Sequence, residues 1–174
     1  ARIILRMDEG DLSDSLGSGE PVSQAVLQRT VIEAVDWLGP IPVSIRASST
    51  AGSRQVEALI RFAHRLECPT ELVTAGRGID QERAEALVDC GLSAVRIRVG
   101  GVSERVHQSV IGAPSVEATD AVMALLAARE SRRADLDIEI GIPWRGRVAE
   151  ELRAVVGWAR QVGVDGYRVL APWK

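Results

Sequence analysis

Short aliphatic runs alternate with longer segments of helical period along the sequence, and this alternation limits the fold more than any other feature. Six runs are rich in Ile, Val and Leu, and apolar residues recur every three or four positions in the segments between them. In the first such segment Leu27, Val31 and Leu38 share one side of a helix. This pattern is typical of consecutive βα units and predicts a parallel sheet. The strands are expected at 2–7, 41–46, 70–74, 94–99, 136–142 and 166–171.

Charged residues occupy alternate positions in several of these runs. Arg96 and Arg98 alternate with Val95 and Ile97, so period two places charges on one face of the strand and aliphatic side chains on the other. Strands buried on both faces should be almost continuously apolar, which argues against a doubly wound sheet. We therefore predict an α/β fold that forms a partial (βα)6 TIM-like barrel with a polar interior. The residues expected on its inner face are Arg6, Arg46, Glu71, Arg96, Arg98, Asp137, Glu139 and Arg168.

This polar inner face has two interpretations. A charged side chain that is buried without a partner is strongly destabilising, so each Arg must meet a carboxylate or a polar ligand. The set is therefore either a ligand-binding interior or an ion-pair network that satisfies itself. The sequence leaves both interpretations open.

Length and composition argue against several classes of protein. The 174 residues suit a single domain, 1–174, and the start at Ala1 just before a strand suggests a domain trimmed from a longer protein. With a net charge of −3 and scattered Arg residues, no nucleic-acid partner is expected. No apolar run approaches the roughly 20 residues of a membrane span. Cys68 and Cys90 lack the spacing of a zinc or disulfide framework, which favours a cytoplasmic location.

Two of the tryptophans follow a proline at the end of a predicted strand. Trp144 and Trp173 stand in "GIPW" and "LAPW", so both are expected on the rim where barrel ligands bind. There they either stack on a ligand or pack against another domain. Trp37 and Trp158 lie in predicted helices and are interpreted as packing residues.

No catalytic or metal-binding motif is complete in this sequence. His64 and His107 are its two imidazoles, and neither has a Ser, Cys or paired carboxylate at a spacing typical of nucleophilic catalysis. The acidic stretch 9–20 fits a calcium loop poorly, because Asp14 occupies the position that requires Gly. No metal site is predicted.

Two longer stretches resemble a known family. "SAVRIRVGGVSERVHQSVIGAP" (93–114) is similar to the fourth βα unit of radical S-adenosylmethionine enzymes, and "ELVTAGRGIDQERAEALVDCGLSAV" (71–95) looks like the preceding unit. The resemblance covers the whole chain in order. It implies a partial barrel of six βα units, a four-iron cluster bound by a CxxxCxxC loop, and S-adenosylmethionine on that cluster. It also implies that His107 is a structural turn histidine.

The sequence departs from this family where its cofactors bind. The resemblance places the CxxxCxxC loop on "DLSDSLGS", where Asp11, Ser15 and Ser18 replace the three cysteines. Thiolates are the ligands that such a cluster requires. The glycine-rich "GGEP" after the second strand is replaced by "ASST", residues 47–50. We therefore expect no iron–sulfur cluster and no bound S-adenosylmethionine, and Asp11, Ser15 and Ser18 form a vestigial cluster loop.

Two functions follow from these observations. The first is a cluster-less, radical S-adenosylmethionine-like pseudoenzyme that binds or scaffolds a peptide or protein partner in a biosynthetic pathway. Because an open barrel exposes sheet edges, the partner is expected to be a peptide, a homologous catalytic subunit or a second copy. The alternative is a non-radical barrel enzyme that binds an anionic small molecule. In that case Arg96, Arg98 and Arg168 are the anion ligands and Asp137 or Glu139 is the acid or base.

Overall fold

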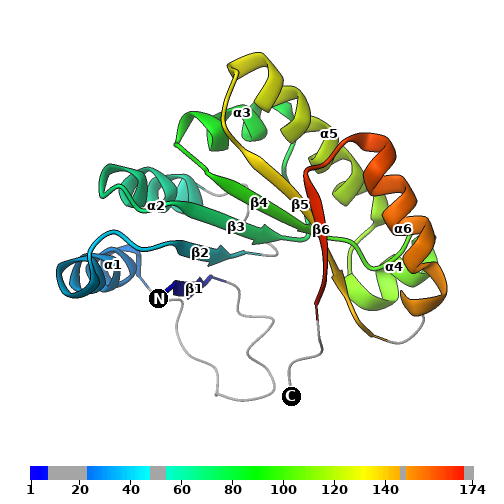
Figure 1. Cartoon of the computed structure of the whole chain (residues 1–174), viewed down its shortest axis with the longest axis horizontal. Helices are drawn as coiled ribbons and strands as arrows, with labels where there is room; N and C mark the ends of the chain where they lie inside the picture. The colour runs from blue at the N-terminus through cyan, green and yellow to red at the C-terminus, as the bar shows by residue number, and fades with distance from the viewer. Residues whose placement is uncertain (8–22, 48–53, 146–147, 171–174) are drawn as a thin grey trace.

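Six parallel strands form one curved sheet in this computed structural model, which describes residues 1–7, 23–47, 54–145 and 148–170. The strands lie side by side in chain order, and each is parallel to the next (Figure 1). A doubly wound sheet would instead reverse its strand order at a switch point. The predicted partial barrel is therefore confirmed. The strands are β1 (Ile3–Arg6), β2 (Val43–Arg46), β3 (Thr70–Thr74), β4 (Ala94–Arg98), β5 (Asp137–Pro143) and β6 (Gly166–Leu170).

The helices lie around the outside of the curved sheet (Figure 1). Each connects two neighbouring parallel strands, with a helical corner of two helices between β4 and β5. Such crossovers are right-handed in nearly all proteins, which places successive helices on the same face of a sheet with sequential strand order. The helices are α1 (Gln24–Leu38), α2 (Arg54–Arg65), α3 (Gln81–Asp89), α4 (Glu104–Ile111), α5 (Ser115–Arg132) and α6 (Val148–Val162).

The core lies between the outer face of the sheet and this helical layer. Ile45, Leu72 and Ile97 come from adjacent strands and are fully buried. They pack in one apolar cluster with residues of the central helix α5, including Val122 and Leu125. The alternating pattern in the strands thus sends aliphatic side chains toward the helices and leaves the charged positions on the concave side.

Helix boundaries follow local signals in the sequence. Asp80 precedes α3, and its side chain accepts a hydrogen bond of 2.9 Å from the backbone N–H of Arg83. Gly39 ends α1 with a φ of 74°, a conformation that favours glycine. These signals mark the start of α3 and the end of α1.

One packing prediction is wrong. Trp37 lies near the end of α1 and is 88% exposed, whereas Trp158 packs against the core as expected. Helix α1 covers the first edge of the sheet, and it buries only Leu27 and Val31 fully. Within the described residues, an apolar side chain at this edge therefore lacks the second neighbouring helix that a central helix has.

Among the described residues, no single helix is long and apolar enough to cross a membrane. Helices α4 and α5 reach that length and composition only together, and they are bent by 88° at their junction. Five residues of α5 are buried in the core, which fits a packed helix of the outer layer.

Candidate functional site

A network of ion pairs crosses the concave face of the sheet, and Arg96 of β4 is its centre. The Nη2 atom of Arg96 lies 2.7 Å from Oε1 of Glu71 on β3 and 2.7 Å from Oε2 of Glu139 on β5. Its Nε donates a second hydrogen bond of 3.1 Å to the same Glu139 oxygen. The guanidinium is therefore held between two carboxylates from the two neighbouring strands.

The network extends to both sides of this centre. On one side Arg168 of β6 donates from Nη2 to Oε1 of Glu139 at 3.0 Å. On the other side Glu71 accepts hydrogen bonds from Ser44 Oγ at 3.0 Å and from Arg2 Nη1 at 3.2 Å. Positive and negative groups thus alternate across the sheet, from Arg168 to Arg2, and each carboxylate has a cation on both sides.

The register of the strands creates this arrangement. Arg96 lies directly opposite Glu139 in the pairing of β4 with β5. Glu71 is paired with Ala94, whose small side chain leaves room beside the strand for the longer Arg96. A Cβ atom at Gly141 would lie 3.0 Å from Cδ of Arg96, so a glycine at this position gives the Arg96 side chain its space.

The two arginines of the network favour the ionised form of Glu139. Burial favours the neutral form of Glu139, but hydrogen bonds from Arg96 and Arg168 outweigh it and lower its pKa. The neighbouring Asp137 is exposed at the start of β5. Desolvation, and to a lesser extent the negative charges of Glu139 and Asp165, raise the pKa of Asp137. Glu139 is therefore an ionised partner of two guanidiniums rather than a proton donor.

The structure brings together most of the predicted inner-face residues. Arg46 and Arg98 are partly buried on the same face as Arg96. Arg6 is placed in β1 by its backbone, and its side chain lies outside the described part. Of the predicted rim aromatics, Trp144 follows β5 and is 44% exposed.

Several predicted residues lie outside the described ranges. Ala47 is buried at the end of β2. The rest of that motif, the loop predicted to be a vestigial cluster site and the second rim tryptophan fall in 8–22, 48–53 and 171–174. The residues concerned are Asp11, Ser15, Ser18, Ser48, Ser49, Thr50 and Trp173.

Both cysteines are buried near the amino ends of strands. Cys68 precedes β3, and its thiol lies 3.6 Å from the carbonyl oxygen of Leu66. Cys90 follows α3 and accepts a hydrogen bond of 3.2 Å from Arg61 Nη2. Ligand sites of barrels form at the opposite, carboxyl ends of the strands. No group of three or more His, Cys, Asp and Glu side chains among the described residues is arranged to hold a metal ion.

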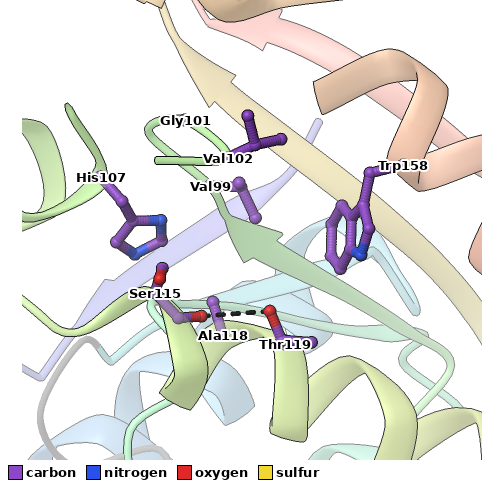
Figure 2. A pocket seen from close by; sticks show the side chains of 8 residues that line it. All are labelled: Val99, Gly101, Val102, His107, Ser115, Ala118, Thr119 and Trp158. Carbon is purple, nitrogen blue, oxygen red and sulfur yellow. Dashed lines mark hydrogen bonds between the residues drawn. The ribbon is translucent and has the colours of Figure 1, made fainter. Parts of the chain in front are cut away.

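A second polar location was not predicted from the sequence. Residues after β4 and from α4, α5 and α6 surround a cavity of about 80 Å³ in the helical layer (Figure 2). His107 lines this cavity and is completely buried. From the sequence, His107 was interpreted only as a turn residue. The cavity also needs a residue of α6, which lies far from α4 and α5 along the chain. No local motif indicated a cavity.

Comparison with solved structures identifies the fold. Streptococcus suis SuiB bound to S-adenosylmethionine matches with a TM-score of 0.78 and 11% identity over 99% of this chain and 41% of that chain. SuiB bound to the precursor peptide SuiA matches with a TM-score of 0.78 and 12% identity over 98% of this chain and 38% of that chain. The protein anSMEcpe with bound AdoMet matches with a TM-score of 0.68 and 15% identity, over 99% of this chain and 50% of that chain.

These similarities are structural only. No protein-family model matches the sequence, and no curated protein matches it. The chain spans half or less of the length of these structures. It therefore has a radical S-adenosylmethionine-like partial barrel, and the sequence-based expectation of this fold is confirmed.

Proposed function

We propose that this chain is a radical S-adenosylmethionine-like domain that binds no iron–sulfur cluster and serves as a binding module for a peptide or protein partner. The observation that carries the proposal is the position of its thiols. The chain has two cysteines, and both are buried at the amino ends of strands, away from the carboxyl ends where barrel sites form. A four-iron cluster held by three protein thiolates cannot be built from them.

The residues at the expected cluster positions do not fit the cluster either. Asp11, Ser15 and Ser18 offer carboxylate and hydroxyl oxygens in place of thiolates. Serine hydroxyls remain protonated at neutral pH and are poor ligands for such a centre. We accordingly assign no step of radical chemistry to this domain. Its two free thiols suit a reducing cytoplasm.

An exposed apolar area at the second edge of the sheet supports a protein or peptide partner. Tyr167 and Val169 of β6 are 41% and 48% exposed, and Trp144 is exposed at the end of the adjacent strand β5. Within the described residues β6 pairs only with β5, so one side of its backbone is open to an added strand. The structurally similar SuiB has been crystallised with a precursor peptide.

The enzyme hypothesis derives less support from the geometry. An anion in the barrel interior would have to compete with Glu139 for Arg96 and Arg168, because both guanidiniums already bind that carboxylate. The ion-pair network therefore favours the interpretation in which the inner face satisfies itself.

Anaerobic reconstitution with iron and sulfide tests the absence of a cluster. We expect the purified protein to remain colourless and to retain no stoichiometric iron after desalting. A native mass spectrum of the protein as isolated is expected to give the bare chain or a multiple of it. Cluster absorption with about four irons per chain would overturn the proposal, and a bound anionic molecule would favour the enzyme hypothesis.

A displayed library of random peptides tests the binding role. We expect extended peptides to be selected, and their binding to be lost in the variant Val169→Lys. Val116 on α5 is also an exposed valine, so Val116→Lys is the matched control. Equal binding to both variants would exclude β6 as the partner surface.

A further inference from the structure

The cavity in the helical layer has a mixed polar and apolar lining. Its walls come from the β4–α4 connection, from α4 and α5, and from one residue of α6. Figure 2 shows His107 and Trp158 on opposite sides, with Ser115, Ala118 and Thr119 of α5 between them. One water needs about 10–15 Å³ of such space, so a cavity of about 80 Å³ holds several waters or a small organic molecule.

His107 leaves its hydrogen-bonding groups unpartnered in this cavity. Its side chain is 0% exposed, and neither Nδ1 nor Nε2 makes a hydrogen bond of ordinary length and angle to the described residues. The backbone of Gly101 is the hydrogen-bonding group in contact with the ring. Burial lowers the pKa of His107, although the Gly101 backbone and the charges of Glu104 and Glu117 oppose this shift. The ring is therefore neutral near pH 7 and presents one N–H donor and one nitrogen acceptor.

The hydroxyl groups of Ser115 and Thr119, which also line the cavity, already donate hydrogen bonds within the protein. Ser115 Oγ donates to Glu104 Oε2 at 2.5 Å, and Thr119 Oγ1 donates to the backbone carbonyl of Ser115 at 3.2 Å. Their oxygen lone pairs remain available as acceptors. A ligand that complements this set must donate to an oxygen or to the imidazole, and it must also accept from the imidazole N–H.

The charges around the cavity restrict the ligand further. Two carboxylates, Glu104 and Glu117, act on the His107 ring, so an anion would be repelled. A cation such as an ammonium ion has no acceptor for the imidazole N–H. The remaining wall is apolar and includes Val99, Val102 and the indole of Trp158. A neutral molecule with a hydroxyl group fits these conditions best.

Carboxylates from neighbouring segments hold the walls in place. Glu151 of α6 accepts hydrogen bonds from the backbone N–H and the hydroxyl of Ser103, at the N-terminus of α4. Glu104 of α4 accepts a hydrogen bond of 2.8 Å from the backbone N–H of Ser115, at the N-terminus of α5. Both contacts satisfy groups at helix N-termini, where negative charge is favourable. These contacts link α6 to the start of α4, and α4 to the start of α5, on the sides of the cavity.

We propose that this cavity is a binding site for a small uncharged hydroxylic molecule, which hydrogen-bonds to His107 and to the oxygens of Ser115 and Thr119. Water fills the site in the absence of an organic ligand, because buried polar groups are satisfied by ordered solvent when protein partners are missing. The site lies outside the barrel interior, so it is independent of the proposed partner surface.

Crystallography of the full chain tests the site directly. In crystals grown without alcohols we expect ordered water within about 3.2 Å of a ring nitrogen of His107. A soak in 2-propanol tests whether the site takes an organic hydroxyl group. Replacement of this water by the alcohol would support the proposal, and water retained in the soaked crystals would overturn it. An empty cavity, or a His107 ring bonded directly to protein, would overturn the proposal.

The two histidines allow the same test in solution. His64 lies on the exposed surface of α2, so its ring resonances are an internal reference for those of His107. In a titration with 2-propanol, or with butan-2-ol as a larger alcohol, we expect saturable shifts of the His107 resonances and only linear solvent shifts of those of His64. Linear shifts of both rings, together with an empty cavity in the crystal, would exclude binding.

A matched pair of threonine variants tests the role of the Thr119 oxygen. Thr119 and Thr30 both donate to the carbonyl oxygen four residues earlier, but only Thr119 lines the cavity. We expect Thr119→Val to weaken the binding of alcohol or water in the cavity about five-fold, which corresponds to the loss of one hydrogen bond. Thr30→Val should leave this binding unchanged. Equal effects of both variants would remove Thr119 from the site. If Thr119→Val fails to fold, the crystal soak of the native chain still decides.

Discussion

The barrel interior and the helical-layer cavity both contain buried polar side chains. The two regions differ in the hydrogen-bond and ion-pair partners that they offer to these side chains. In the interior, Arg96 has carboxylate partners on both neighbouring strands. In the cavity, His107 has no hydrogen-bond partner within the described residues. Strand register brings opposite charges into contact at a fixed spacing, whereas the cavity presents His107 with two hydroxyl oxygens, the backbone of Gly101 and apolar groups. The first region is therefore complete in itself, and the second is suited to a ligand.

Removal of Arg96 is expected to have the largest effect on stability. Arg96→Met leaves Glu71 and Glu139 without their shared cation, and breaking a buried pair in this way costs about 3–5 kcal/mol. Urea denaturation measures the change. The control is Arg168→Met, which removes an ion pair whose arginine side chain is 57% exposed and should cost less than about 1 kcal/mol. Equal losses of stability in the two variants would mean that Arg96 contributes no more to the network than the exposed Arg168 does.

Acid should weaken the same network. Because the pKa of Glu139 is below its ordinary value of 4.5 in the folded state, its contribution is complete above about pH 4.5 and is lost as the pH falls through the folded pKa. We expect the free energy of unfolding to fall more steeply below pH 4.5 in the native chain than in Glu139→Gln. The surface variant Glu33→Gln serves as the control, since Glu33 and Arg29 are largely exposed. Parallel pH profiles would contradict this assignment.

The wall of the cavity can be loosened without changing its polar groups. Glu151→Ala removes the acceptor at the N-terminus of α4 and should cost about 1 kcal/mol, as other losses at helix N-termini do. Hydrogen exchange should accelerate at the amides of α4 more than at those of α2. The adjacent Glu150→Ala is the control. Unchanged exchange in α4 would show that Glu151 does not hold this wall.

The smallest effect is expected at His107 itself. His107→Phe should change stability at pH 8 by less than about 1 kcal/mol, because an apolar ring of similar shape leaves no nitrogen unsatisfied. The folded-state pKa of His107 lies below 6.5, so the unfolded chain binds a proton first and the native chain loses stability relative to the variant as the pH falls below 6.5. Thermal unfolding between pH 5 and 8 measures this difference. A pH-independent difference would mean that the ring is not held neutral.

The sequence predicted the fold and the composition of the inner face for one physical reason. Side chains alternate strictly along a strand, so Arg96 and Glu139 are assigned to a face as soon as the strands are located. Which cation meets which carboxylate depends on strand register. The pairing of Arg96 with Glu139 and its contact with Glu71 therefore became visible only in the structure.

The cavity and the exposure of Trp37 were beyond prediction for a different reason. The cavity requires α4, α5 and α6 to meet beside β4, and the sequence contains no local signal for that meeting. Trp37 was predicted to be packed because it lies in an amphipathic helix, but the outer side of α1 has no second helix beside it in the described part. Both results depend on the packing of helices, which periodicity alone does not specify.

The contact between Glu151 and Ser103 also has a consequence for the order of assembly. These residues are 48 positions apart, so the first turn of α4 gains its carboxylate only after α6 has been synthesised and has docked. The contact of Glu104 with Ser115 spans only 11 positions and can form as soon as α5 appears. During synthesis we therefore expect the corner between α4 and α5 to form first, and the docking of α6 to complete the wall beside His107.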